Sequence, residues 1–330
     1  TFHEELADAI SRFRSIAIIA AASVRKFAPD DNVVQSCVAL KADYCVTGSI
    51  AGGDEIVLRV DLIEVSSGRR IWTDTATSSS SRLLEAPALI ATRIVGRLVG
   101  SVEADAARRA QTVPTASLQS YAHMIKGIAL IRQHGDGVNE AGKAELQIAA
   151  GLDPHSGLIQ AYLALADAMI ARYRPNETVA LRAARDRAVQ ATALSPDEAR
   201  CYRILAIILS YLREYSAAEA QYERAIQLNP YDADTLAQFG FMRAMRGDPD
   251  QALDLMARAA QLNPFHPDWY HSDRSAPLYM LGRYRESAEA LERLPHLTAW
   301  QAARVAAAYA MDGQNEKARR HLSDVFEKDP

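Results

Sequence analysis

Apolar and small residues follow two different patterns in this chain. From Tyr121 to Pro330 they recur at helical spacing in segments that end at a proline, whereas the part from Thr1 to Val113 mixes helical and strand-like patterns. The fold class we expect is therefore a small α/β domain with a mixed sheet, followed by an all-α region. We place the α/β domain at 1–113, a linker at 114–120 and the helical region at 121–330.

The helical region repeats itself. The ending IQLNP at 226–230 returns as AQLNP at 260–264, and related endings occur elsewhere in the region. The terminal prolines are Pro154, Pro196, Pro230, Pro264, Pro295 and Pro330, at successive intervals of 42, 34, 34, 31 and 35. A period of about 34 residues is typical of units built from two antiparallel helices, which bury their apolar faces only by stacking. With the unit that begins near Tyr121, we expect about six helical hairpins.

The two clearest units carry small and large residues at matching positions. The first has Tyr202, Leu205, Ala206, Ala218, Tyr222 and Ala225, and the second has Leu236, Phe239, Gly240, Ala252, Met256 and Ala259. Small residues let the paired helices approach closely, and the closing proline stops the second helix because it has no amide hydrogen. This pattern resembles the tetratricopeptide repeat family, which implies an α-helical solenoid.

Two units depart from the regular repeat. About eight extra residues fall near Arg172–Val179, and the spacing predicts a longer loop between helices there. In the unit after Pro264, Pro277 falls where the first helix runs. We therefore expect that helix to be kinked or short.

The part from Thr1 to Val113 predicts a sheet covered by helices. Helical spacing covers Phe2–Phe13, Asn32–Lys41 and a long segment from about Ser81 to Ala110, which includes Leu84, Ile90, Ile94, Leu98 and Val102. Strand patterns cover Ser15–Ala20, Tyr44–Ile50, Glu55–Val65 and Arg69–Thr75. The sequences Ala51-Gly52-Gly53-Asp54 and Ser66-Ser67-Gly68 suit hairpin turns, so the last three strands are expected to form an antiparallel meander.

Several phrases of this first part occur in the same order in a known domain. EELADAISRF, SIAIIA, ALKADYCVTGSI and VLRVDLIEVSSGRRIW, followed by a long helix, resemble the TolB amino-terminal-like domain of bacterial signalling proteins. The usual first strand of that domain has no counterpart here. In such proteins the domain stands between an effector and tetratricopeptide repeats. The effector is most often a winged-helix DNA-binding domain, as in antibiotic-regulatory-protein-like activators, and otherwise a class III nucleotide cyclase.

Composition narrows the function classes. The chain has 37 basic and 41 acidic residues among 330, and neither part is basic, so nothing predicts a grip on nucleic acid by this region. The longest apolar run, Ile16–Ala22, is far shorter than a membrane span. Three cysteines without CxxC spacing argue against a disulfide framework or a zinc knuckle, and fit a reducing, cytoplasmic compartment.

The sequence offers few candidates for chemistry. In HPDWYHSD at 266–273, His266, Asp268, His271 and Asp273 have metal-ligating side chains, but Asp268 also suits a helix cap and the aromatic residues suit a core. Glycines near Gly52 suit a hairpin better than a phosphate loop. We therefore expect no catalytic residues, no metal site and no cofactor.

The tetratricopeptide resemblance implies a binding surface, because in that family the first helices line a concave face that contacts partner peptides. The corresponding positions here are Arg200, Arg203, Ile207, Tyr211, Ala237, Phe241 and Met245. Two cations beside an aromatic and methionine strip favour an acidic or amphipathic segment, held by charge-assisted hydrogen bonds and apolar burial. The alternative is that Phe241 and Met245 pack internally or against the α/β domain.

These observations predict a non-catalytic sensory and protein-interaction region of a bacterial signalling regulator. The resemblance implies a transcriptional regulator whose DNA-binding domain lies upstream of Thr1; the regulatory region of a class III adenylate cyclase and an assembly scaffold are the alternatives. The expected partner is a protein or peptide in the repeat groove. Self-association into a homo-oligomer is left open, and neither nucleic acid nor membrane is an expected partner.

Overall fold

The chain forms two compact units, Thr1–Lys126 and Gly127–Pro330. The computed structural model describes residues 2–13, 16, 18–19, 33–52, 55–79, 91, 94–102, 105, 120–133, 137–171, 177–263 and 266–328. Residues 114–119 of the expected linker lie outside this described part, and Ser120 already belongs to a helix.

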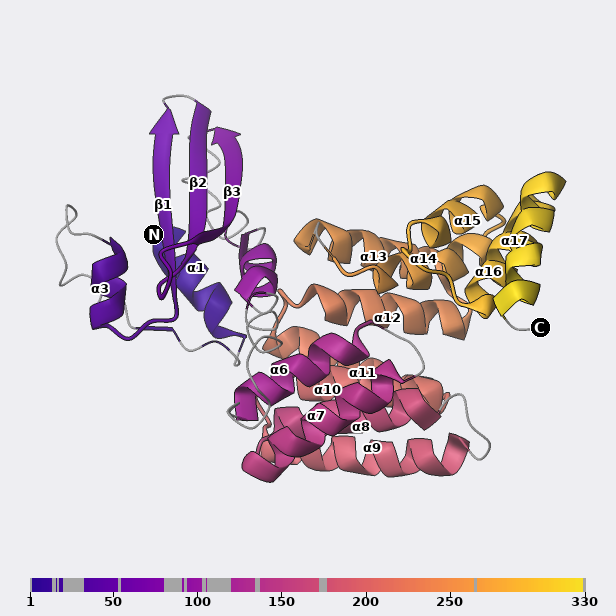
Figure 1. The fold of residues 1–330 in the computed structure, drawn as a ribbon, viewed down its shortest axis with the longest axis horizontal. Coiled ribbons are helices and arrows are strands. Elements are labelled where there is room, and N and C mark those ends of the chain that lie inside the picture. Colours follow the sequence, from indigo (N-terminus) through magenta and orange to yellow (C-terminus); the bar gives the residue numbers. More distant parts are fainter. Residues whose placement is uncertain are drawn as a thin grey trace. The chain divides into compact units, whose positions relative to one another are not determined.

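A three-stranded antiparallel sheet forms the centre of the first unit (Figure 1). The elements are α1 (Phe2–Ser11), α3 (Val33–Ala39), β1 (Tyr44–Gly52), β2 (Glu55–Glu64) and β3 (Arg70–Ser79). The strands follow the order β1-β2-β3, and Tyr44 faces Glu64 while Glu55 faces Ser79. The expected meander is therefore confirmed. Gly68 in the second turn has a φ of 68°, a conformation that glycine adopts without steric cost.

The buried apolar residues of β2 alternate along the strand and lie on the covered face of the sheet. Leu58, Val60 and Leu62 are buried, as the period of two along a strand requires. The described part of the long closing helix, at 91, 94–102 and 105, is helical and buries Ile94, Val95, Leu98, Val99 and Val102. The expected positions Leu84 and Ile90 lie outside the described residues.

Polar contacts fix this helical segment to the sheet. Arg97 Nη1 lies 2.5 Å from Asp74 Oδ2 on β3. The buried carboxylate of Asp105 accepts hydrogen bonds from the Tyr44 hydroxyl on β1 (3.2 Å) and from Arg69 Nη2 (3.2 Å). The helix therefore contacts both outer parts of the sheet through charged groups, in addition to its apolar residues.

One predicted strand differs from the structure. Ile16, Ile18 and Ile19 are described and are not in a strand, while the other residues of Ser15–Ala20 lie outside the described part. The sheet of the described residues is therefore antiparallel throughout rather than mixed. A short apolar run without alternation does not by itself specify a strand, which explains the wrong prediction.

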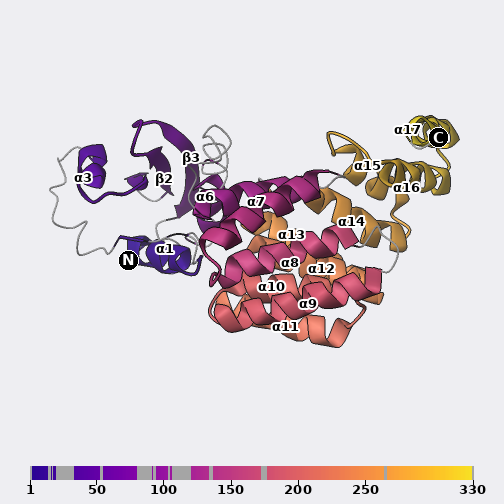
Figure 2. The same ribbon diagram turned by 60° about the horizontal axis from the view of Figure 1, so that its bottom comes forward.

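The second unit is a series of antiparallel helix pairs (Figures 1 and 2). Its described helices, the first of which begins before the boundary at Gly127, are α6 (Ser120–Ile131), α7 (Val138–Leu152), α8 (Gly157–Ala171), α9 (Glu177–Leu194), α10 (Ala199–Tyr211), α11 (Tyr215–Leu228), α12 (Ala233–Arg246), α13 (Pro249–Leu262), α14 (Trp269–Met280), α15 (Tyr284–Glu292), α16 (Ala299–Met311) and α17 (Asn315–Lys328). We number the hairpins one to six, from α6/α7 to α16/α17. None of the described helices combines the length and apolarity that a membrane crossing requires.

Close helix approach within a hairpin depends on small residues. Gly240 on α12 faces α13 so closely that an added methyl group would lie 2.8 Å from the Ala252 carbonyl oxygen. Gly127 on α6 meets α7 in the same way at Gly142. Neighbouring hairpins pack through larger side chains, and Tyr222 of hairpin three stacks on Phe239 of hairpin four with ring centres 5.1 Å apart.

The two irregular units have different outcomes. Residues 172–176 of the expected long loop lie outside the described part, and α9 begins at Glu177. Pro277 lies inside α14, which continues to Met280. The helix passes through the proline, and the second helix of this hairpin, α15, has only nine residues.

Candidate functional site on the first helices of the hairpins

The seven residues predicted to contact a partner lie on two neighbouring first helices. We call this set the predicted partner surface: Arg200, Arg203, Ile207 and Tyr211 on α10, and Ala237, Phe241 and Met245 on α12. Spacings of three and four residues place each group on one helix face. Exposure rises along both helices, from buried Arg200 and Ala237 to half-buried Tyr211 and to Met245, which is 38% exposed.

Arg200 is held by its own helix terminus. Its side chain is buried, with Nε 3.0 Å from Glu198 Oε1 and Nη2 3.0 Å from Glu198 Oε2. The Glu198 carboxylate also accepts from the Arg200 backbone N–H and so caps α10. Burial would raise the pKa of Glu198, but the charge and hydrogen bonds of Arg200 outweigh it, and the pKa is lowered.

Arg203 is buried among groups from other hairpins. Nη2 donates to the Tyr162 hydroxyl on α8 at 3.1 Å, and Nη1 donates to Gln238 Oε1 on α12 at 3.3 Å. Two carboxylates of hairpin four complete its surroundings, with Asp234 Oδ2 3.5 Å from Nη1 and Asp232 Oδ2 3.4 Å from Nε. The guanidinium is thus neutralised inside the protein.

Asp234 is the centre of this network. Its carboxylate accepts a hydrogen bond from Arg132 Nη2 at 3.1 Å and from the Tyr270 hydroxyl at 2.9 Å, in addition to the contact with Arg203. We call the set the ionic cluster: Arg132, Tyr162, Arg203, Asp232, Asp234 and Tyr270. Its members come from hairpins one to five in chain order.

The charges of the ionic cluster stabilise one another. Burial would raise the pKa of Asp234, but the charges of Arg132 and Arg203 and the hydrogen bond from Tyr270 outweigh it, and the pKa is lowered. For Arg203, burial acts against the charged form, but Asp232, Tyr162 and Asp234 raise the pKa above its usual value. Asp234 is therefore ionised at neutral pH and Arg203 is charged.

Sequence reasoning named Arg203 and missed its carboxylate partners. Asp232 and Asp234 begin α12, and Asp232 also caps that helix by accepting from the Asp234 backbone N–H at 3.1 Å. Asp234 follows Arg203 by a separation of 31 in the chain, three less than the repeat length of 34, so it lies about one helical turn before the position equivalent to Arg203 in the next unit. That spacing between opposite charges was the available signal.

The accessible part of the predicted partner surface is apolar and aromatic. Because Arg200 and Arg203 hold internal carboxylates, Tyr211, Phe241 and Met245 are the members with appreciable exposure. Whether this surface binds a partner stays a prediction.

The HPDWYHSD segment packs through its rings. His266 stacks on Tyr270 with ring centres 4.6 Å apart, and its ring meets the edge of His271 at 4.8 Å. Within the described residues, no three His, Cys, Asp or Glu side chains lie together as a metal would require.

Comparison with known proteins supports the helical fold. No protein-family model matches the chain, and no curated protein matches it. Among solved structures, the hetero-tetramer Cut9-Hcn1 of APC/C is 15% identical over 76% of this chain and 51% of its own, with a TM-score of 0.55. Human IFIT1, solved as a dimer with PPP-AAAA, is 18% identical over 74% of this chain and 62% of its own, with a TM-score of 0.52. A tetratricopeptide repeat protein from Parabacteroides merdae is 12% identical over 76% of this chain and 91% of its own, with a TM-score of 0.45.

At these identities the likeness shows the fold alone. This chain spans about three fifths of the IFIT1 chain and half of the Cut9-Hcn1 chain that it matches. Together with the helix pairs and the repeat spacing, the two matches above a TM-score of 0.5 show that the second unit is a solenoid of stacked helix pairs, as the repeat spacing predicts. The expectation that this region binds no nucleic acid stays a prediction.

Proposed function

We propose that this chain is the sensory and protein-interaction region of a bacterial signalling regulator, specifically a transcriptional regulator with its DNA-binding domain upstream of Thr1. The TolB-like phrases in the first unit and the repeats in the second support this proposal. They occur in the order that such regulators have.

The exposed end of the predicted partner surface carries the proposal. Tyr211 and Phe241 are half-buried and Met245 is exposed, and all three lie in the C-terminal halves of α10 and α12, whereas Arg200 and Arg203 are buried. Solvent-exposed methionine and aromatic side chains adapt to an apolar partner surface. The partner segment is therefore amphipathic and held by apolar burial, while the two arginines shape the surface from within.

Partner binding regulates an effector only if it favours one of two states. In this proposal the partner binds the repeats more tightly in one arrangement or oligomeric state of the regulator than in the other. The intact regulator is therefore the object to study.

Site-specific photocrosslinking in the intact regulator tests the surface. A crosslinking amino acid in place of Met245 is expected to give a discrete protein adduct, which weakens when Tyr211→Ala and Phe241→Ala are introduced. The control position is Val189 on the second helix α9, which is also exposed. The same adducts from both positions, or adducts indifferent to the two alanines, would remove the proposed surface.

A further inference from the structure

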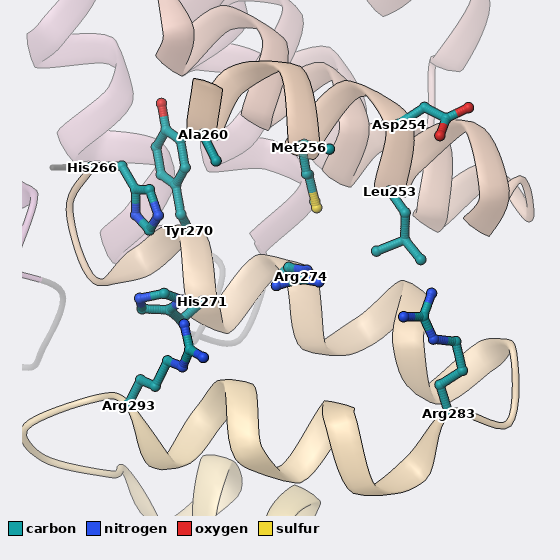
Figure 3. Close-up of a pocket in the computed structure, with 11 residues that line it drawn as sticks. Leu253, Asp254, Met256, Ala260, His266, Tyr270, His271, Arg274, Arg283 and Arg293 are labelled. Atoms are coloured by element: carbon teal, nitrogen blue, oxygen red, sulfur yellow. The ribbon is translucent and has the colours of Figure 1, made fainter. Parts of the chain in front are cut away.

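A basic pocket opens between three helices of hairpins four and five (Figure 3). Its volume is about 510 Å³, within the range of small-molecule sites. Part of the wall is apolar and comes from α13, through Leu253, Met256 and Ala260. The opposite side comes from α14 and from the two ends of α15. These helices differ from α10 and α12, so the inference below is independent of the proposed partner surface.

Positive charge dominates the polar lining. Arg274, Arg283 and Arg293 line the pocket together with two histidines, against the single carboxylate of Asp254. Figure 3 shows the Asp254 side chain directed away from the three arginines. Arg283 is neutralised from outside, since Nε and Nη2 lie 2.7 and 2.6 Å from the two oxygens of Glu286.

The other two arginines have no such partner. Within the described part of the chain, neither the Arg274 nor the Arg293 side chain forms an ion pair or a hydrogen bond. Both face the pocket, and Arg293 lies beside His271 in Figure 3. Two guanidinium groups thus supply unused N–H donors to one cavity, and Asp254 is the one carboxylate among its lining residues.

The imidazole of His271 lies among these positive charges. Burial lowers the pKa of His271, and the neighbouring His266, Arg293 and Arg274 lower it further, while Asp268 acts in the opposite sense. An anion among these groups would relieve the repulsion. His266 and Tyr270, stacked with an angle of 5° between their planes, form a flat aromatic wall at the same end of the pocket.

We propose that this pocket binds a phosphate monoester, whose phosphate is held by Arg274 and Arg293 and whose organic part lies against Met256 and the His266–Tyr270 wall. Guanidinium groups match the oxygen geometry of phosphate and donate paired hydrogen bonds to it. A bare inorganic anion would leave most of the cavity to water, whereas a phosphorylated organic ligand fills both the charged and the apolar part.

Isothermal titration with phenyl phosphate tests the site in the full chain. Saturable one-to-one binding is expected, and replacing Arg274→Ala and Arg293→Ala together should weaken it by about tenfold or more, since each loses charge-assisted hydrogen bonds. Both side chains are exposed and unpaired, so the helix pairs should keep their circular dichroism and Tm.

The matched control removes two other exposed arginines, by Arg182→Ala on α9 and Arg258→Ala on α13, neither of which lines the pocket. This variant carries the same change of net charge as the test variant but keeps the pocket arginines. Its affinity for phenyl phosphate should therefore stay within about twofold of that of the unmodified chain. Equal weakening in both double variants would reduce the effect to nonspecific charge and overturn the proposal. Absence of saturable binding would overturn it as well.

Two further probes identify the source of the phosphate. Binding of phenyl phosphate that exceeds that of a phosphoserine peptide supports a small-molecule ligand, and the reverse order would overturn that assignment in favour of a phosphorylated protein. Histidine side-chain NMR provides an independent readout. Occupancy by phenyl phosphate should shift the ring signals of His271 and His266, and unchanged signals at saturation would place any binding elsewhere.

Discussion

Arg203 stands among four polar side chains that leave its charge almost no access to solvent. With 3% of its surface exposed, it contacts Tyr162, Asp232, Asp234 and Gln238. A buried ion pair of this kind adds little over an apolar core, because desolvation offsets the attraction. Removing one partner strongly destabilises the protein, since the remaining charges stay buried without compensation.

Replacement of Arg203 by alanine is therefore expected to lower the free energy of unfolding by about 3–5 kcal/mol. Urea unfolding followed by circular dichroism measures the change. Arg182→Ala, at an exposed site on α9, serves as the control and should stay within about 0.5 kcal/mol. A loss below about 1 kcal/mol for Arg203→Ala would mean that the carboxylates find water or another cation.

The lowered pKa of Asp234 makes part of the stability dependent on pH. The folded-state pKa lies below the unfolded value of about 3.9, so the carboxylate contributes stability above that pH and loses it as the pH falls through the folded-state pKa. Compared with Asp234→Asn, the unmodified protein should be more stable at pH 7, and the difference should shrink below about pH 4. Urea midpoints of both proteins between pH 7 and 3 measure it. A constant difference would show that the charge of Asp234 is not the cause.

Helix pairs meet closely only where a side chain is absent. Gly240 leaves no room for a Cβ atom, with Ala252 O at 2.8 Å and Met256 Cγ at 3.0 Å from its ideal position. Gly151 on α7 is a helical glycine of the opposite kind, because no heavy atom lies within 4 Å of the corresponding position.

The same substitution should therefore act in opposite directions at the two glycines. Gly240→Ala is expected to destabilise by about 1–3 kcal/mol through overpacking. Gly151→Ala is expected to stabilise by about 0.4–1 kcal/mol, since alanine restricts the unfolded chain and suits a helix. Thermal unfolding of both variants provides the measurement, and a loss of similar size at both sites would refute the packing argument.

The elements that could be predicted from the sequence are those in which apolar residues keep a helical or an alternating spacing. The helices of the repeats were found because small and large residues keep helical spacing inside each unit, and β2 because Leu58, Val60 and Leu62 alternate with polar neighbours. The strand expected at Ser15–Ala20 rested on an apolar run without alternation, and Ile18 is 41% exposed in the structure.

Contacts between hairpins could not be predicted from local pattern. Arg203 was recognised as lying on the right helix face, but its capture by Asp234 depends on how hairpins three and four stack. The basic pocket could not be predicted from the sequence either, because Arg274, Arg283 and Arg293 come together only when α14 and α15 fold against α13. Spacing along the chain places a residue on a face, whereas the partners of that residue follow from packing.

Each of the two units has its own buried residues, which are Leu58, Val60 and Leu62 in the first and Tyr222 and Tyr309 among others in the second. A fragment of residues 120–330, which keeps α6 whole, is therefore expected to fold alone. It should show a helical circular dichroism spectrum and one cooperative thermal transition, which Gly240→Ala lowers. A fragment that melts gradually, or that is insensitive to Gly240→Ala, would show that its core needs the first unit.

Asp234 has a consequence for how the repeats come apart. Arrays in which each repeat contacts only its neighbours fray from an end, one repeat after another. Here the carboxylate of Asp234, in hairpin four, accepts a hydrogen bond from Arg132. Arg132 directly follows α6 and is 102 residues away in the chain. Unfolding of hairpin one would remove the counter-charge of Arg132 from Asp234 in hairpin four. Hairpin one therefore cannot unfold without destabilising hairpin four.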